Sequence, residues 1–289
     1  MLKDAVRPNA VVSIDVEEWF HILDSPATPL PEKWGSLESR VQGSMELLLK
    51  TLAETDTKAT FFWLGWMARR HRDLLLRTHQ AGHEIACHGD MHVLPYEVGP
   101  ERFRADISVP KREIEDLIGE SVAGLRAPGF GITEEASWAF DVIREAGYVY
   151  DSSIFPASRA HGGMKNAKMG PHTLTTASGP LYEFPMSVVE IFGRRLALFG
   201  GGYLRLSPLW LIRWGLGRLE ADGIPLVVYV HPREVDPDHP RLPLGAVRHF
   251  KSYVNLRSTL PKLEWICRNC ACVPMRDMID VCFPESMGQ

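Results

Sequence analysis

The sequence predicts an α/β fold built on a largely parallel sheet. Strand-like and helix-like segments alternate along most of the chain, which is the arrangement of parallel sheets with crossover helices. Residues 225–232, PLVVYVHP, form an apolar, β-branched run typical of a buried strand. The chain has 289 residues, a length common for one α/β domain. We therefore expect a single domain over residues 1–289, with a C-terminal extension at about 235–289 that packs on it.

The individual elements are predicted from local patterns of apolar and turn-forming residues. The expected strands, some of which run into loops, are residues 11–15, 59–65, 83–87, 124–130, 148–155, 181–191 and 225–232. The expected helices are residues 36–54, 66–80, 101–118, 134–146 and 208–222. Residues 156–180 are rich in small and polar side chains, which indicates a long surface loop. Residues 195–206 are apolar but contain three glycines, and residues 249–283 contain a helix and a Cys-rich segment.

Polar side chains follow several of these strands. They are Asp15, His88, Arg126, Asp151 and His231. In a parallel α/β barrel the C-terminal strand ends converge on one face, so these side chains are expected to lie close together.

Composition excludes several classes of protein. The formal net charge is −4, from 36 acidic and 32 basic residues, which argues against a nucleic-acid binder. Asp4, Arg7 and Pro8 interrupt the N-terminus, which therefore does not resemble a secretory signal, and no apolar run is long enough to span a bilayer. The five cysteines form no obvious disulfide framework. We expect a cytoplasmic location, leaving peripheral membrane association and the oligomeric state open.

Two histidines provide the strongest local signal for a metal. In GHEIACHGDMH (82–92), His88 and His92 are four residues apart, so on a helical turn or a tight loop both rings can face one ion. The alternative is a pair of surface histidines in a chain that has 11. The preceding strand favours the metal site, because it places His88 at a strand end.

Three carboxylates lie near the first strand, in SIDVEEW (13–19). A site with only two histidines also needs a carboxylate ligand. Asp15 and Glu17 point the same way in an extended strand, so one could bind the metal while the other acts as a base. Glu18 then points elsewhere unless the strand bulges. The alternative is an acidic exit from a strand into a loop.

An arginine and a further histidine complete the candidate set. Arg126, before a Pro-Gly loop, could form a bidentate pair with Asp15, although a surface salt bridge is the simpler reading. His231 follows four apolar residues and could be a general acid or base, or a structural residue.

Seven motifs, in order, resemble those of the polysaccharide deacetylase superfamily (NodB homology, carbohydrate esterase family 4). They are SIDVEEW, TFFWLG, GHEIACHGDMH, RAPGFG, YDSSIFP, LYEFP and VVYVHP. Four further segments resemble the subgroup associated with exopolysaccharide and exosortase loci. These are DVEEWFH, GGGYLRL, HPREVDPDHPR and FKSYVNLRSTLPKLE.

The resemblance implies a distorted (β/α) barrel of seven or eight strands with the site at the C-terminal face of the strands. By motif position it implies these roles: Asp15 as the catalytic base, His88 and His92 as metal ligands, Arg126 as the partner of the base, and His231 as the acid that protonates the leaving nitrogen. The common motif has a metal-binding Asp directly after the base, whereas this chain has Val16. Some relatives use an Asp two positions after the base, so we expect Glu17 as the third ligand, with Glu18 as the alternative.

These observations predict a metal-dependent hydrolase that removes an acetyl group from an N-acetylated sugar or polysaccharide precursor. We expect one divalent ion, zinc first and Co, Ni, Mn or Fe as alternatives, to activate water for Asp15. Phe130 and Tyr203 could contact the sugar, or could be a core aromatic and a plain turn.

Three rivals stay open. One is a deformylase or another amide hydrolase acting on a lipid- or nucleotide-linked sugar. The second is a catalytically silent carbohydrate-binding protein, which Val16 would permit. The third is a structural zinc site in the Cys-rich segment, with thiolates from Cys267, Cys270, Cys272 and Cys282.

Overall fold

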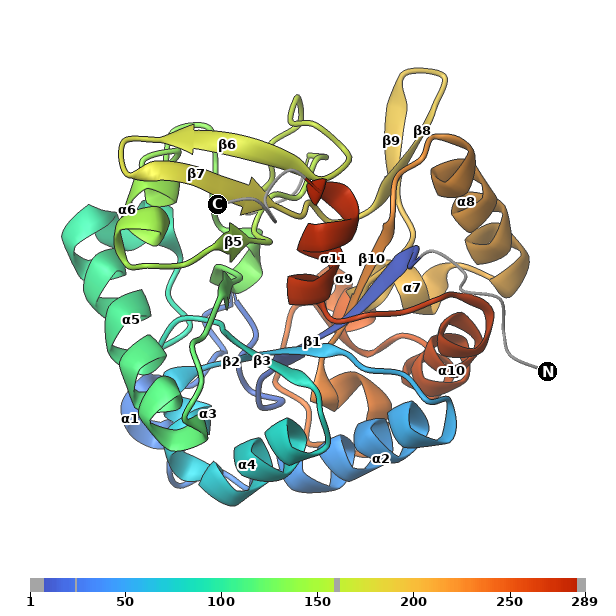
Figure 1. The fold of residues 1–289 in the computed structure, drawn as a ribbon. Helices are drawn as coiled ribbons and strands as arrows, with labels where there is room; N and C mark the ends of the chain where they lie inside the picture. The colour runs from blue at the N-terminus through green and yellow to red at the C-terminus, as the bar shows by residue number, and fades with distance from the viewer. Residues whose placement is uncertain (1–7, 24, 159–161, 285–289) are drawn as a thin grey trace.

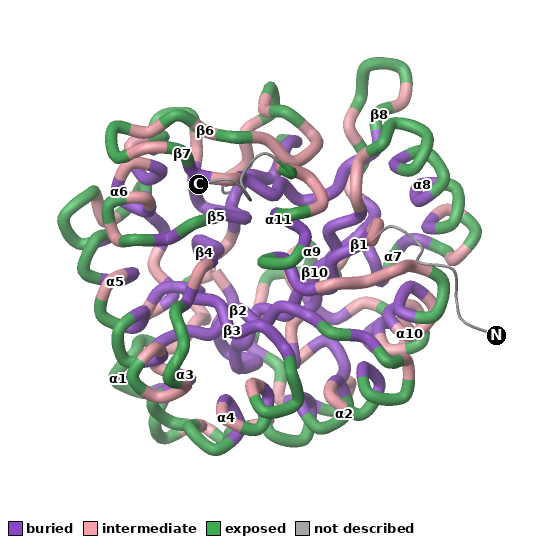
Figure 2. The backbone as a smooth tube through the Cα atoms, in the orientation of Figure 1, coloured by how far each residue is buried: buried purple, intermediate pink, exposed green. Residues whose placement is uncertain are grey.

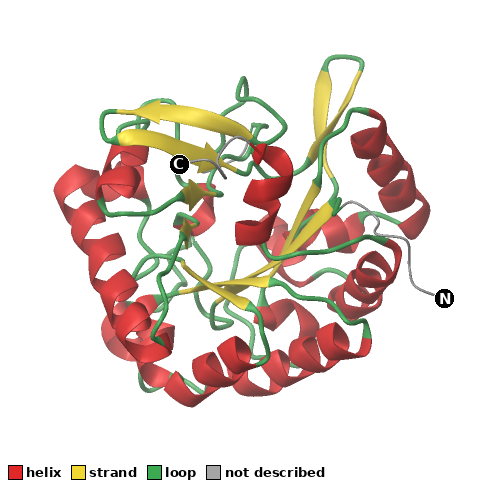
Figure 3. Ribbon diagram, in the orientation of Figure 1, coloured by secondary structure: helices red, strands yellow, loops and turns green. Residues whose placement is uncertain are grey.

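The protein is a curled eight-stranded sheet surrounded by helices, as Figures 1 and 3 show for the computed structural model. The structure describes residues 8–23, 25–158 and 162–284. The strand order is β10-β1-β2-β3-β4-β5-β7-β6, and every neighbouring pair is parallel except β6 with β7. A separate hairpin contains β8 and β9. The predicted distorted (β/α) barrel is therefore confirmed.

The elements have the following bounds. The strands are β1 Ala10–Val16, β2 Thr60–Trp63, β3 Glu84–Cys87, β4 Gly124–Leu125, β5 Tyr150–Asp151, β6 His172–Thr176, β7 Gly179–Glu183, β8 Val188–Ile191, β9 Arg194–Ala197 and β10 Leu226–Val230. The α-helices are α1 Pro31–Trp34, α2 Val41–Glu54, α3 Gly65–Arg70, α4 Arg72–Gln80, α5 Pro95–Ile118, α6 Ala139–Glu145, α7 Gly201–Leu206, α8 Leu209–Ala221, α9 Ala246–Tyr253, α10 Thr259–Asn269 and α11 Met275–Cys282. Three short 3₁₀ helices are η1 Pro128–Phe130, η2 Pro232–Val235 and η3 Leu256–Ser258.

Strand β1 shows how the sequence divides the interior into two layers. Its even-numbered apolar residues, such as Val12 and Ile14, belong to the large core between the sheet and the helices. Val11 instead belongs to a second core inside the curl, with Phe62 and Tyr229. Successive side chains point to opposite faces of a strand, so Asp15 shares the inner face with Val11. Both faces of the strand are buried, as Figure 2 shows for the central strands.

Helix α11 covers the end of the barrel that holds the strand N-termini. The backbone N–H of Met275 donates to Oγ1 of Thr60, and that of Arg276 donates to the carboxylate of Glu84. Thr60 and Glu84 begin β2 and β3, and α11 lies near the middle of the ring of helices in Figure 1. The opposite end of the barrel, where the strands finish, stays available for a site.

The structure corrects several predicted boundaries. The expected loop at 156–180, of which 159–161 lie outside the described residues, contains β6, and the expected strand at 181–191 is divided between β7 and β8. Strand β6 exists because it pairs with β7 in a hairpin, from Thr176 with Gly179 to His172 with Glu183, which the small and polar composition of the segment does not reveal. The expected helix at 66–80 breaks at His71 into α3 and α4. Among the described residues, no helix is both long and apolar enough to cross a membrane.

Candidate active site at the strand ends

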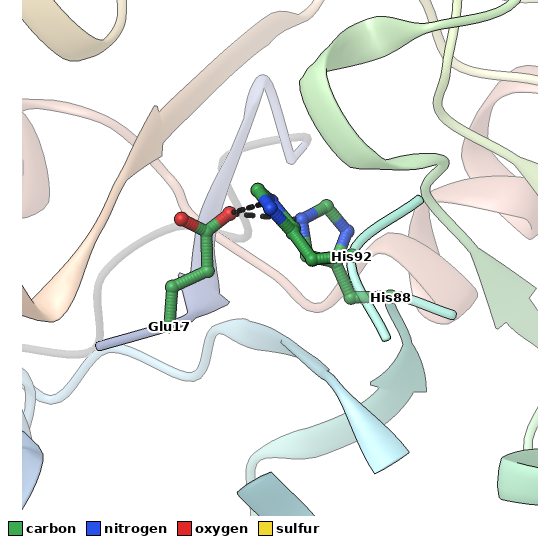
Figure 4. A group of neighbouring side chains, drawn as sticks. All are labelled: Glu17, His88 and His92. Atoms are coloured by element: carbon green, nitrogen blue, oxygen red, sulfur yellow. Dashed lines mark hydrogen bonds and ion pairs between the residues drawn. The ribbon is translucent and has the colours of Figure 1, made fainter. Parts of the chain in front are cut away.

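Three side chains that could hold a metal ion meet at the C-terminal ends of β1 and β3. Glu17 follows β1, His88 follows β3, and His92 lies on the loop after His88 (Figure 4). Oε1 of Glu17 is 3.1 Å from Nε2 of His88 and 2.9 Å from Nε2 of His92. In the part of the chain that the structure describes, this is the one group of three or more possible ligands. The Cys-rich segment therefore forms no such group there, which argues against the structural zinc site.

The loop between the two histidines is held against α5. Oδ1 of Asp106 accepts a hydrogen bond from the backbone N–H of Met91, at 3.1 Å. Gly89 has a φ of +77°, and a Cβ at this position would lie 2.5 Å from Oδ2 of Asp106. Glycine therefore allows the close approach, and His92 follows with a φ of +55°. The histidines face Glu17 from a tight loop rather than from one helical turn.

The protonation of His88 supports a cation between these side chains. Nδ1 of His88 is 2.7 Å from the backbone carbonyl of Arg126, which can only accept, so Nδ1 carries a proton. Nε2, 3.1 Å from Oε1 of Glu17, is thereby directed at the carboxylate: with a proton it donates to Glu17, and without one it offers a lone pair to a cation between the two. A histidine held by a backbone carbonyl in this way is the usual arrangement at divalent ions.

The charge of Glu17 fits the same role. Burial raises the pKa of this carboxyl, but the positive charges of His92 and His231 and the hydrogen bonds from the histidines outweigh it. The pKa of Glu17 is held well below its ordinary value. Glu17 is therefore ionised, as a metal ligand must be.

Asp15 is held beside this group by a buried arginine. Nη1 of Arg126 donates to Oδ1 of Asp15 at 2.7 Å and to Oγ of Ser13 at 2.9 Å, while the remaining nitrogens bond Ser152. The guanidinium also lies 4.2 Å from the ring centre of Phe62. The expected bidentate pair is wrong, because Ser152 takes two of the arginine's nitrogens. Oδ2 of Asp15 is left facing the pocket.

His231 faces both carboxylates from the end of β10. Its Nε2 is 3.9 Å from Oδ2 of Asp15 and 3.8 Å from Oε1 of Glu17, and Glu234 holds Nδ1 at 3.1 Å. Burial lowers the pKa of His231, but the charge of Glu17 and the hydrogen bond with Glu234 outweigh burial, so the pKa is raised. Burial has the opposite effect on Glu234 and raises the pKa of its carboxyl. The charge of Arg205, whose Nε is 3.2 Å from Oε1 of Glu234, and the hydrogen bond with His231 outweigh burial and lower this pKa to about 2.

Two of the candidate acids serve other purposes. The carboxylate of Glu18 accepts hydrogen bonds from Ser39 and from the backbone N–H of Arg40, at the start of α2. It therefore stabilises the unsatisfied N–H groups of that helix. Asp151 accepts from the backbone and hydroxyl of Ser153, and its burial beside Glu183 raises the pKa of both carboxyls.

A pocket of about 270 Å³ opens over Asp15, Glu17 and His231. Phe130 and Tyr203 both line it, and Phe130 is buried against Tyr229 at a ring-centre distance of 4.9 Å. A Cβ on Gly200 would lie 2.0 Å from the ring of Tyr229. The first glycine of the GGGY segment therefore allows contact with a core aromatic ring, while the next two glycines line the pocket.

His21 also lines the pocket, and the sequence did not single it out. Its Nδ1 accepts from the backbone N–H of Glu18 at 3.3 Å, and its ring stacks on His92. Burial and the charge of His92 lower the pKa of His21 well below the ordinary value, so the ring is neutral and Nε2 carries the proton. Nε2 is buried and has no hydrogen-bond partner among the described residues. The sequence feature that could have indicated a role for His21 was the motif DVEEWFH, in which His21 follows the three acidic residues.

Two family models match the chain. The polysaccharide deacetylase model matches residues 37–150, and a domain of unknown function, DUF3473, matches residues 152–280. The resemblance to the polysaccharide deacetylase superfamily is therefore supported over residues 37–150. The first match begins after β1, the strand in which Val16 departs from the common motif. No protein with a curated description matches the chain.

Solved structures share the fold. A protein from Mycobacterium smegmatis assigned as a polysaccharide deacetylase is 18% identical with a TM-score of 0.65, and the match covers 99% of this chain and 94% of that one. PuuE allantoinase is 15% identical with a TM-score of 0.63, covering 97% and 93%. A family 4 carbohydrate esterase from Streptomyces lividans, in complex with acetate, is 14% identical with a TM-score of 0.50, covering 93% of each chain. At these identities the likeness shows the barrel fold alone.

Proposed function

We propose that this protein is a metal-dependent hydrolase that removes N-acetyl groups from an N-acetylated sugar or polysaccharide precursor. The observation that carries the proposal is the cluster of Glu17, His88 and His92 beside the ion pair of Asp15 and Arg126. The match of residues 37–150 to the polysaccharide deacetylase model supports the same reaction.

The three clustered side chains would hold one divalent ion, with Glu17 taking the place of the usual aspartate. Two histidines and a carboxylate suit zinc and several other divalent ions. Such an ion, when bound, polarises the acetamide carbonyl and lowers the pKa of the attacking water. Glu18 is excluded from this role in the proposal, because its carboxylate binds the start of α2.

Asp15 and His231 would divide the proton transfers. Oδ2 of Asp15, left open by the bond of Arg126 to Oδ1, takes a proton from the water that attacks the acetamide carbon. His231, protonated and directed by Glu234, gives a proton to the nitrogen as the carbon–nitrogen bond breaks. Acetate and the free amine leave.

His21 would position the substrate. Its Nε2–H is a buried donor at the pocket wall with no partner among the described residues, and a buried unsatisfied donor costs about 1–3 kcal/mol. A hydrogen bond to an oxygen of the substrate would remove that cost. Phe130 and Tyr203 would form the apolar part of the same wall.

The test is release of acetate from N-acetylated mono- and oligosaccharides by the purified chain, with and without a chelator. We expect acetate, loss of the activity with chelator and its recovery on adding zinc. Release of formate or ammonia instead would contradict the choice of substrate. Absence of both product and bound metal would indicate a silent carbohydrate-binding protein.

A further inference from the structure

Helices α7 and α9 expose apolar side chains beside the pocket, and α8, which follows α7 in the chain, exposes two tryptophans. Six of the thirteen exposed large apolar side chains among the described residues lie on these three helices: Tyr203, Leu206, Trp210, Trp214, Val247 and Phe250. We call these six side chains the apolar rim. Helix α7 contacts α9, and Tyr203 and Leu206 line the pocket. A concentration of this kind on one part of a protein marks an interaction surface rather than ordinary scatter.

The apolar rim is mixed with cations on the same helix faces. On α8, Trp210, Arg213 and Trp214 are spaced three and four residues apart and share one face. On α9, Val247, Phe250 and Lys251 have the same spacing. Helices that lie at the surface of a bilayer combine aromatic and aliphatic side chains with Lys and Arg in this way.

Two stretches of chain around the apolar rim contain no acidic residues. Residues 191–219 and 239–263 contain no Asp or Glu but ten Lys and Arg, of which six are exposed and one, Arg205, is buried in an ion pair with Glu234. Arg248 and Lys251 from the second stretch line the pocket together with Arg233. Nε and Nη1 of Arg233 are buried without a hydrogen-bond partner among the described residues. The charge of this surface is therefore complementary to an anionic partner.

We propose that the exposed faces of α7, α8 and α9 bind the headgroup region of an anionic membrane, with the mouth of the pocket facing the lipid. The tryptophans and Phe250 enter the interface between headgroups and acyl chains, and Lys251 meets the lipid phosphates. A second copy of the chain fits this surface less well, because two identical cationic faces would meet. Aliphatic Leu206 and Val247 favour hydrocarbon over the flat bases of a nucleic acid.

The consequence concerns substrate delivery. A pocket held at the headgroups receives saccharides that are attached to a membrane lipid without extracting the lipid from the bilayer. This consequence depends on the proposed hydrolase activity, whereas membrane binding itself does not.

The test is co-sedimentation of the full chain with vesicles, at low and physiological salt. We expect binding to vesicles of phosphatidylglycerol and phosphatidylcholine, and much weaker binding to phosphatidylcholine alone. The double variant Trp210→Ser, Phe250→Ser should lower the partition coefficient about tenfold or more, because exposed apolar area supplies much of the affinity. Lys251→Glu should lower it about fivefold or more and reduce the salt dependence.

Matched controls lie on α2, away from the pocket. Leu47 is 43% exposed and Lys50 is also exposed, so Leu47→Ser and Lys50→Glu should leave vesicle binding unchanged. Equal binding by the rim and control variants, or no binding to anionic vesicles, would overturn the proposal. Two other results would overturn the membrane proposal. A wild-type dimer that the double variant dissociates, without any vesicle binding, would indicate a second copy of the chain on this surface. Tighter binding to an oligonucleotide than to vesicles would indicate a nucleic acid.

Discussion

The two walls of the pocket are built in opposite ways. The strand-end wall, from β1, β3 and β4, is buried, and its charges are paired over short distances, as in Asp15 with Arg126 and Glu17 with the histidines. The helical wall, from α7, η2 and α9, contains the buried pair of Arg205 and Glu234, but its outer part is open, and Tyr203 and Lys251 there are exposed.

This difference indicates a division of labour. A catalytic group must be held rigidly where charge develops, and the buried network of the strand-end wall does this before substrate arrives. Surface groups that select and orient a substrate need only be within reach. The division follows the family matches only in part: His88, His92 and Arg126 lie within residues 37–150, and α7 and α9 lie within residues 152–280. Asp15 and Glu17 precede both matches, and His231 lies in the second. Changes to the buried charged groups, His231 included, should therefore reduce turnover, and changes to the exposed side chains of α7 and α9 should alter affinity.

The largest effect is expected for Asp15→Asn. This change keeps the size of the side chain but removes the base, so kcat should fall about 10³-fold or more while bound metal is retained. Initial rates of acetate release and metal analysis of the purified variant measure both quantities. Asp238→Asn, on an exposed residue, is the matched control and should behave as wild type. Near-normal turnover by Asp15→Asn would remove Asp15 from the catalytic role.

His231→Gln should have the next largest effect. Burial lowers the pKa of His231, but Glu17 and Glu234 outweigh burial and raise it, so the protonated acid persists to a higher pH than in an ordinary histidine. The wild-type rate should fall as the pH rises through this raised pKa, when the acid loses its proton. The variant should lose about 100-fold in kcat and also lose this alkaline decline. The pH profile of kcat/KM measures this, with His172→Gln on β6 as the control. An unchanged alkaline limb in His231→Gln would show that another group is the acid.

A smaller effect is expected for His21, which borders both walls. His21→Phe removes one hydrogen bond to the substrate and should raise KM about tenfold with a smaller change in kcat. His21→Gln retains an N–H donor and should recover part of the loss. Equal kinetics for Phe, Gln and wild type would mean that Nε2 does not contact the substrate.

The sequence predicted the strand-end wall well because strand geometry determines it. Alternation along β1 places Asp15 and Glu17 on one face, and parallel pairing brings the end of β3 beside them. Arg126 and His231 were also indicated by their places at strand ends, and the family motifs then suggested their roles.

The helical wall was harder to predict, because its residues meet only through tertiary packing. His21 lies on a turn after β1, where no periodicity fixes the direction of a side chain. The role of Glu18 depends on α2, whose start at residue 41 rather than 36 was not visible in the apolar spacing. Lys251 and Tyr203 are far apart in the chain and come together because α9 packs on α7.

The most direct test of the central claim is the metal content of wild type, Glu17→Ala and Glu18→Gln, measured together with chelator-sensitive acetate release. We predict about one divalent ion per wild-type chain and per Glu18→Gln chain, with acetate release by both. Loss of a residue that only hydrogen-bonds a metal ligand weakens metal binding by roughly 10–100-fold. Glu17→Ala removes a ligand itself, so it should weaken binding by more than this and should be inactive. Acetate release by a wild-type chain that binds no metal, or full metal content in Glu17→Ala, would contradict the claim that Glu17 completes a catalytic metal site.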